Sequence, residues 1–115
     1  VPLSAWSRWV AALLTDHGLP DPQLEHRIVR ADGSLIAQVD LAYPHERIAI
    51  ELQSVRHHLA RDAFERDAIR AAELAVAGWT WLPVTWDRYR ASPEQIVHTV
   101  RETRTLASHP RNPPG

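Results

Sequence analysis

The 115-residue chain contains no cysteine, no lysine and no methionine, and each absence narrows what the protein can do. Without cysteine it can form neither a disulfide nor a thiolate metal site, which fits a cytoplasmic protein. Without lysine no reaction step can use a lysine amine, and all 13 basic residues are arginines. Because methionine is missing even at position 1, we expect a processed or excised piece of a longer protein, with room for an upstream domain.

Long apolar runs and a strong charge of either sign are missing too. No apolar run approaches the roughly 18 residues of a membrane span, and the first residues do not resemble a signal peptide. The formal net charge is −1, so phosphate binding would have to come from local arginines rather than from an overall basic surface. With 44% apolar residues, the chain is predicted to form one packed domain over residues 1–107, followed by a disordered tail at 108–115.

Apolar spacing and turn residues predict the order of the elements. Helices are predicted over 4–17, from about 58 to 77 and from residue 92 onward, and strands over 23–30, 35–43, 48–53 and 79–86. Asp32-Gly33 predicts a two-residue hairpin loop, and Pro44–Arg47 predicts a four-residue turn. The order implies an α/β fold, an αβββαβ(α) core in which helices flank a mixed four-stranded sheet.

The second half of the chain carries more detailed predictions. A narrow apolar stripe is predicted on the 58–77 helix, formed by Ala60, Phe64, Ala68, Ala71 and Ala75. Pro83 places the last strand at a sheet edge, because proline cannot donate a ladder hydrogen bond. Trp79, Trp81 and Trp86 are candidates for stacking on bases. For Trp79 and Trp81, whose alternation points both to one face, core packing is favoured instead.

The two predicted turns set a register that brings carboxylates together. The first turn places Glu25 opposite Asp40, and the second places Asp40 opposite Glu51. Directly opposed Cβ atoms lie about 4.5–5.5 Å apart, where like charges destabilise a sheet. A divalent cation would remove this conflict, and clustered oxygen ligands suit Mg²⁺ or Mn²⁺. The alternative is a solvated strand face whose acids are neutralised by nearby arginines, namely Arg27, Arg47 or Arg56.

The pattern of Asp40 followed by Glu51-Leu52-Gln53 on two neighbouring strands resembles the PD-(D/E)XK nuclease superfamily. Within it, the chain is similar to the small DUF559 group, which looks like the very-short-patch-repair endonucleases. The matching segments, in order along residues 18–100, are GLPDP (18–22), ADG (31–33), VDLAYP (39–44), IELQSVRHH (50–58), RDAIRAAELAVAGW (66–79) and VTW (84–86). The resemblance implies a restriction-endonuclease-like fold and a Mg²⁺-dependent DNA endonuclease with a role in repair or defence.

The resemblance also implies roles for individual residues. Asp40 and Glu51 would hold one or two Mg²⁺ or Mn²⁺ ions, and Glu25 is added as a ligand from the register alone. Gln53 could orient a water molecule but could not take its proton, because a neutral amide is not a base. His57 matches the family histidine, and its ordinary pKa of about 6.5 suits a general base. A substrate phosphate or solvent could also act as the base, with His57 then a surface residue.

Three arginines on the 58–77 helix, Arg61, Arg66 and Arg70, are candidates for contacts with DNA phosphates. The alternative is pairing along the helix surface, of Arg66 with Asp62 and of Arg70 with Glu73. The sequence does not decide between the two.

The chain departs from the family pattern at four positions. Gln53 stands where relatives have Asp or Lys, and Ser54 stands where they have Gly. In the first helix, Ser7 and Ala11 replace a Glu and an Arg. A glutamine at the third motif position occurs in some restriction enzymes of the superfamily, so Gln53 does not by itself indicate an inactive site.

Three functions therefore stay open. The first is an active metal-dependent endonuclease. The second is a catalytically degenerate nuclease fold that acts as a nucleic-acid-binding or regulatory module. The third is a protein-interaction domain that uses Trp6 and Trp9 of the first helix.

Overall fold

A computed structural model describes residues 3–53 and 60–108. The elements are α1 (Leu3–Asp16), β1 (Gln23–Val29), β2 (Leu35–Tyr43), β3 (Ile48–Gln53), α2 (Ala60–Val76), β4 (Thr80–Thr85), α3 (Trp86–Ala91) and α4 (Pro93–Ser108). This order confirms the predicted αβββαβ(α) arrangement, and each predicted helix and strand appears within a few residues of its expected bounds. The short helix α3 was not predicted.

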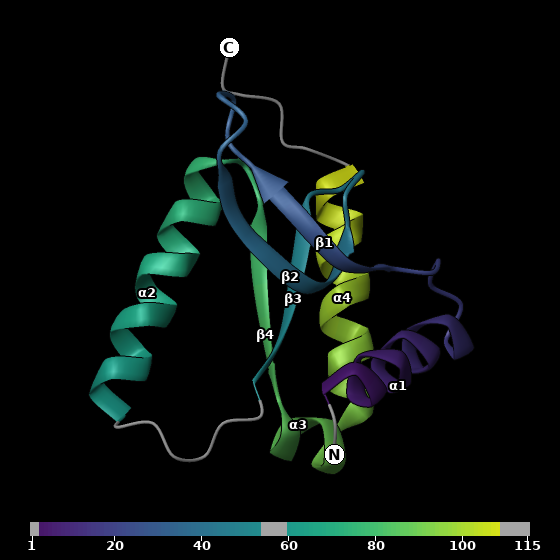
Figure 1. Cartoon of the computed structure of the whole chain (residues 1–115). Coiled ribbons are helices and arrows are strands. Elements are labelled where there is room, and N and C mark those ends of the chain that lie inside the picture. The colour runs from purple at the N-terminus through teal and green to yellow at the C-terminus, as the bar shows by residue number, and fades with distance from the viewer. Residues whose placement is uncertain (1–2, 54–59, 109–115) are drawn as a thin grey trace.

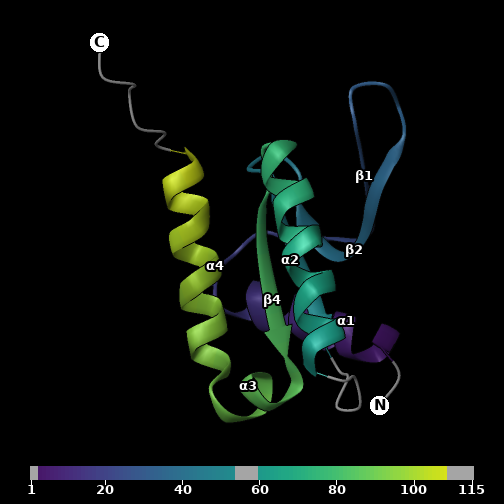
Figure 2. The ribbon, with the colours of Figure 1, turned by 90° about the vertical axis from the view of Figure 1, so that its left-hand side faces the viewer.

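One mixed sheet, in the order β1-β2-β3-β4, forms the centre of the molecule. The first three strands are antiparallel neighbours, and β4 pairs with β3 in parallel after the crossover through α2. Helix α2 lies on one side of the sheet, and α1 and α4 lie on the other (Figures 1 and 2). The predicted α/β fold with a helix-flanked, mixed four-stranded sheet is therefore confirmed.

The loop between β1 and β2 differs from the prediction. The N–H of Arg30 donates to the carbonyl of Ser34 at 2.8 Å, so the loop has three residues rather than two. Its last residue, Gly33, has a φ of 89°, a conformation that glycine adopts without steric cost.

The predicted pairing of β1 with β2 survives this longer loop. The register shifts between Ile28 and Val29, which leaves one extra residue on β2. This bulge cancels the extra loop residue, so that beyond it His26 faces Val39 and Leu24 faces Leu41, as the two-residue loop would have placed them.

The turn between β2 and β3 is the predicted four-residue turn. Tyr43 pairs with Ile48, and Arg47 closes the turn with a φ of 56°. Beyond the turn, Ile48 and Ile50 face one core, whereas Glu51 faces the other side of the sheet. The side chains of β3 thus alternate between the two sides of the sheet.

Strand β4 lies at the sheet edge, as Pro83 predicted. The strand ends one residue earlier than expected, because the side-chain oxygen of Thr85 accepts a hydrogen bond from the N–H of Arg88 at 3.1 Å and caps α3. Trp86 therefore begins a helix instead of ending a strand. Helix α4 then begins at Pro93, directly after Ser92, as predicted.

The side of the sheet covered by α1 and α4 carries the larger core. Trp6, Val10 and Leu14 of α1 are buried there at helical spacing, against buried residues of the sheet and of α4. The rest of this buried cluster comprises Leu19, Leu41, Tyr43, Ile48, Ile50, Leu52, Val84, Ile96, Val97 and Val100. The sheet residues of this core come from β2, β3 and β4.

An ion pair fastens α4 to the turn between β2 and β3. Arg104 Nη2 lies 2.6 Å from Glu46 Oε1, and the Glu46 side chain is only 8% exposed. The same guanidinium lies over the ring of Tyr43, 5.2 Å from its centroid. The hydroxyl of Tyr43 donates to the carbonyl of Pro20 at 2.7 Å, which ties the segment before β1 to the same corner.

The side of the sheet that faces α2 has a smaller core, in which Leu74 is the fully buried residue of the helix. The predicted apolar stripe on α2 is wrong, because Phe64 is 75% exposed and Ala68 and Ala75 are exposed as well. Polar residues take part in the contact with the sheet instead. The stripe had the right spacing for a helix but did not identify the face that packs.

None of the described helices is long and apolar enough to cross a membrane. Of the predicted tail at 108–115, only Ser108, the last residue of α4, lies within the described residues.

Candidate functional site

Asp40 lies where β2 separates from β3. Counted from the turn, the backbone ladder between these strands ends with the pair of Leu41 and Ile50, so it stops one position short of Asp40. Asp40 Oδ2 accepts a hydrogen bond from the N–H of Leu52 at 2.8 Å. A side-chain hydrogen bond therefore joins the two strands where the backbone hydrogen bonds end. The contact fixes the orientation of a half-buried carboxylate next to β3.

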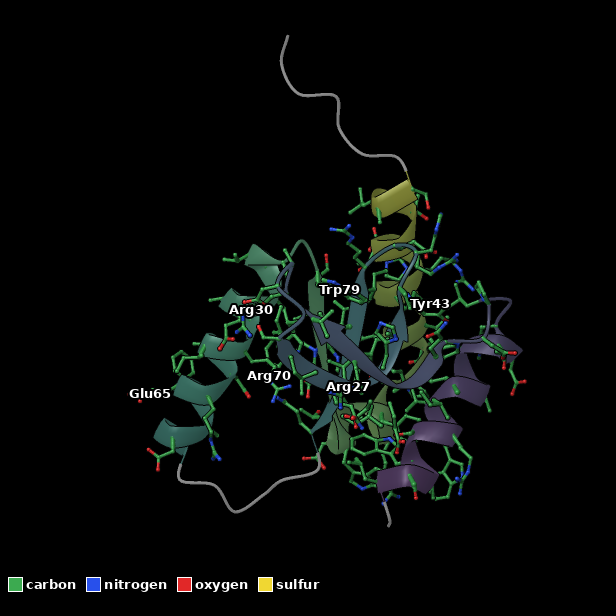
Figure 3. The ribbon with its side chains drawn as sticks, turned by 45° about the horizontal axis from the view of Figure 1, so that its top comes forward. Arg27, Arg30, Tyr43, Glu65, Arg70 and Trp79 are labelled. Carbon is green, nitrogen blue, oxygen red and sulfur yellow. The ribbon has the colours of Figure 1, made fainter. Side chains whose placement is uncertain are left out.

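Glu51, on β3, is the second carboxylate of the site. Its Oε1 accepts hydrogen bonds from Arg70 Nη1 at 2.9 Å and from Trp81 Nε1 at 3.2 Å. Its side chain is 18% exposed, against 39% for Arg70. Figure 3 shows Arg70 reaching from α2 toward the sheet.

Burial raises the pKa of both carboxyl groups. For Asp40, the hydrogen bond from Leu52 and the charge of Arg70 oppose this effect, and the charge of Glu25 adds to it. For Glu51, Arg70 and the hydrogen bond from Trp81 lower the pKa, and the charge of Asp40 raises it. Each pKa lies above its ordinary value, so the contacts within the protein do not fully compensate the two negative charges.

Neither predicted pair of the row, Glu25 with Asp40 or Asp40 with Glu51, is among the paired positions of the strands. The charge of Glu25 nevertheless acts on Asp40, and that of Asp40 acts on Glu51. Glu25 itself is exposed, with a φ of 52°, an uncommon conformation for a residue other than glycine. Arg70 neutralises the acids in part. It is not one of the arginines predicted for this role that the structure describes, which are Arg27 and Arg47. Arg47 instead donates to the carbonyl of Ala77.

Gln53, at the third motif position, also contacts α2. Its Nε2 donates to Asp67 Oδ2 at 3.0 Å, which leaves Gln53 Oε1 as a hydrogen-bond acceptor. Gln53 and Asp67 line a cleft of about 470 Å³ between α2 and the sheet, and Glu51, Arg66 and Arg70 line it too. The cleft thus brings the second and third motif positions together with two of the candidate arginines.

The three candidate phosphate-binding arginines have different surroundings. Arg70 is engaged by Glu51, and Arg66 lines the cleft while its Nε donates to the backbone carbonyl of Asp62 at 3.4 Å. The side chain of Arg61 lies outside what the structure describes. The predicted alternative pairing of Arg70 with Glu73 is wrong, because Glu73 Oε2 lies 2.6 Å from Arg30 Nη2.

His57, together with His58, lies outside the described residues, so its role as a general base stays a prediction. Sequence reasoning missed the partnership of Glu51 with Arg70 and Trp81. Trp81 was assigned to the core, and it does pack there through its ring while its N–H reaches Glu51. Only the parallel register of β3 and β4, which pairs Ala49 with Trp81, reveals this contact.

The tryptophans fall into two groups. Trp79 and Trp81 pack against the core on the α2 side, which confirms the predicted packing. Trp86 lies at the opposite end of β4, with ring centroids 5.3 Å from Trp6 and 6.5 Å from Trp9. Trp6 is buried and Trp9 is 45% exposed, so of the two tryptophans proposed as a protein contact only Trp9 is accessible.

The donor atoms that remain can be compared with what a divalent cation needs. In the part of the chain that the structure describes, no group of three or more His, Asp or Glu residues could hold a metal ion. Asp40 and Glu51 do offer one oxygen each, Oδ1 and Oε2, that accepts no hydrogen bond from the described residues. Mg²⁺ is commonly bound by one or two carboxylates and several water molecules, so the kind and number of these donors suit such an ion.

Comparison with known proteins identifies relatives without an assigned activity. "Uncharacterized protein Rv2248" of Mycobacterium tuberculosis (strain ATCC 25618 / H37Rv) is 34% identical over 94 residues, which cover 82% of this chain and 34% of the relative. "Uncharacterized protein MT2308" of strain CDC 1551 / Oshkosh matches to the same extent. The chain thus spans about a third of the length of the curated relatives it matches. No protein-family model and no solved structure matches it.

Proposed function

We propose that this chain is a Mg²⁺- or Mn²⁺-dependent DNA endonuclease domain that hydrolyses phosphodiester bonds in DNA repair or defence. The observation that carries the proposal is the position of Asp40 and Glu51 on neighbouring strands, with Asp40 accepting from the N–H of Leu52 next to Glu51 and with Glu51 lining a polar cleft. Both are half-buried, both have a raised pKa, and each has one oxygen that accepts no hydrogen bond from the described residues. Two half-buried carboxylates with raised pKa values oppose folding, and a bound cation would offset this cost.

Each residue has a defined task under this proposal. Asp40 and Glu51 would hold the cation, which when bound would acidify nearby water and stabilise negative charge on the phosphate. Gln53 Nε2 is held by Asp67, so its Oε1 can accept a hydrogen bond and orient the attacking water. Because an amide cannot take the proton, His57, a substrate phosphate or solvent would have to act as the base.

DNA binding would rely on the arginines of α2. The net charge of −1 provides no overall attraction for a polyanion. Arg66 and Arg70 both line the cleft that Glu51 lines, and a guanidinium can bind a phosphate through two hydrogen bonds. They would position the backbone without reading the base sequence.

Cleavage of plasmid DNA in the presence of Mg²⁺ or Mn²⁺ tests the proposal. Asp40→Asn keeps an oxygen that can accept the hydrogen bond from Leu52 but removes the charge, so we expect cleavage to fall at least about a hundredfold. Asp16→Asn, at an exposed position at the end of α1, is the matched control and should cleave like the wild type. If Asp40→Asn cleaves as fast as the wild type, the catalytic proposal is wrong.

A catalytically degenerate nuclease fold, acting as a nucleic-acid-binding or regulatory module, is the second candidate. It is favoured by the contact of Arg70 with Glu51, which supplies positive charge without a metal ion, and by Gln53 at the third motif position. Calorimetric titration with Mn²⁺ separates the two candidates. Tight binding that is lost in Glu51→Gln would contradict the degenerate fold, and absence of binding both with and without DNA would contradict the nuclease.

A further inference from the structure

The ion pair between Arg70 and Glu51 lies within the candidate site rather than on an outer surface. Arg70 Nη1 is 2.9 Å from Glu51 Oε1, and Trp81 donates to the same oxygen. The charge of Arg70 also lowers the pKa of Asp40, so one guanidinium acts on both carboxylates. Arg70 is therefore the positive charge that the described structure provides for the acidic pair.

This arrangement has a cost for a metal-binding site. A cation held by Asp40 and Glu51 would lie close to the guanidinium, and two positive charges at this range repel each other. As long as Arg70 stays on Glu51, the cation must therefore bind against its charge. Metal binding and the Arg70–Glu51 contact compete.

The side chain of Arg70 can also contact a second anion in the cleft. Its side chain is 39% exposed, and it lines the cleft beside Arg66, which lies about one helical turn earlier on α2. A phosphodiester that enters this cleft offers Arg70 a second anion, and guanidinium groups bind phosphates in a bidentate manner. The exchange requires a side-chain movement without any rearrangement of the fold.

We propose that Arg70 is an exchangeable counterion: it neutralises Glu51 in the free protein and transfers to a backbone phosphate when nucleic acid binds. The transfer frees Glu51 for the cation, so nucleic acid and cation bind cooperatively. This inference rests on the proposed function, because it assigns Arg70 a role as a positioning residue at the same site. By thermodynamic linkage, the factor by which nucleic acid tightens cation binding equals the factor by which the cation tightens nucleic-acid binding.

The test is calorimetric titration with Mn²⁺, alone and with a saturating phosphorothioate DNA duplex that resists cleavage. For the wild type, we expect the duplex to tighten Mn²⁺ binding about tenfold, within the usual range of coupling between sites. Arg70→Gln removes the charge, so Mn²⁺ alone should bind about tenfold more tightly than it binds to the wild type, and the duplex should add less than about twofold.

Two further variants make the result specific. Arg70→Lys keeps the positive charge and should bind Mn²⁺ alone as weakly as the wild type. Arg101→Gln changes an arginine of α4, which donates to the carbonyl of His17, and should leave Mn²⁺ binding unchanged. A thermal unfolding curve of each variant confirms that it is folded before titration.

The outcomes separate this inference from the proposed function. If Mn²⁺ binds to the wild type and is lost in Asp40→Asn, but Arg70→Gln binds it equally or more weakly, the counterion role is wrong and the metal site stands. If Mn²⁺ binds to neither the wild type nor Arg70→Gln, with or without the duplex, the metal site and the counterion role are both overturned.

Discussion

The two sides of the sheet differ in what fills the space between sheet and helix. On the side of α1 and α4, buried apolar residues fill the interface, among them Leu14 of α1 and Val100 of α4. On the side of α2, an apolar core surrounds Leu74, and a polar cleft beside it is lined by Glu51, Gln53 and Arg70. One strand, β3, contributes to both, with Ile50 on the first side and Glu51 on the second.

This difference shows how a small domain can separate stability from chemistry. The side covered by α1 and α4, called the closed side below, supplies most of the apolar burial, and this burial is the dominant stabilising contribution in folding. The α2 side can then carry raised pKa values and charged contacts that contribute little to stability. The following predictions test whether the two sides divide the work in this way.

The largest effect is expected for an apolar truncation on the closed side. Leu14→Ala removes a fully buried side chain and should cost about 3 kcal/mol of unfolding free energy. Phe64→Ala, on the outward side of α2, removes a larger side chain that is 75% exposed and should change stability by less than about 0.5 kcal/mol. Urea unfolding followed by tryptophan fluorescence measures both, and similar costs at the two positions would contradict the division.

Ion pairs on the two sides should differ in the same direction. Arg104→Ala leaves Glu46, a side chain only 8% exposed, without its partner, and should cost about 2 kcal/mol. Arg30→Ala breaks the pair with Glu73 on the α2 side, where both side chains are more than 40% exposed, and should cost at most about 1 kcal/mol. The same unfolding experiment measures both variants. A cost for Arg30→Ala that equals or exceeds that for Arg104→Ala would be evidence against the comparison.

The smallest effect, and the one with opposite sign, is expected at the site. Because burial raises the pKa of Asp40, the folded protein holds this proton more tightly than the unfolded chain does. The resulting stabilisation is complete below the unfolded-state pKa, about 4, and is lost as pH rises through the raised folded-state pKa. Asp40→Asn has no such loss, so at pH 7 its Tm should exceed that of the wild type by about 2–4 °C.

Thermal unfolding of Asp40→Asn and wild type at several pH values checks this sign. The difference in Tm should shrink toward zero as pH falls well below about 4, where the wild-type carboxyl is protonated in both states. Asp16→Asn again serves as the control, because this residue is exposed at the end of α1. A Tm for Asp40→Asn below that of the wild type at pH 7 would show that Asp40 stabilises the fold.

Sequence predictions were right where the signal acts between residues close together in the chain, and wrong where it depends on residues far apart. The four-residue turn fixed the pairing of Tyr43 with Ile48, and alternation fixed which side of the sheet Ile50 and Glu51 face. The pairing of β1 with β2 was right because a bulge compensated a loop of the wrong length. The predicted α2 stripe was wrong because spacing identifies a helix but does not say which face meets the sheet.

The candidate site was predictable only in its antiparallel part. Asp40 and Glu51 were placed on neighbouring strands by one short turn, Pro44–Arg47, which the sequence encodes locally. Arg70 and Trp81 reach Glu51 from elements that follow a long crossover, and no local signal fixes the register or helix position there. The same reason explains why Gln53 meets Asp67, a contact that joins β3 to α2.

The sequence by itself therefore determined the order of helices and strands, the edge position of β4 and the placement of two acids on adjoining strands, because turns, alternation and proline act over a few residues. Only the tertiary structure decided which charge those acids meet. The packing of α2 against the sheet depends on contacts far apart in the chain, and it brought Arg70 to Glu51, where the pairing along the helix surface would have sent it to Glu73.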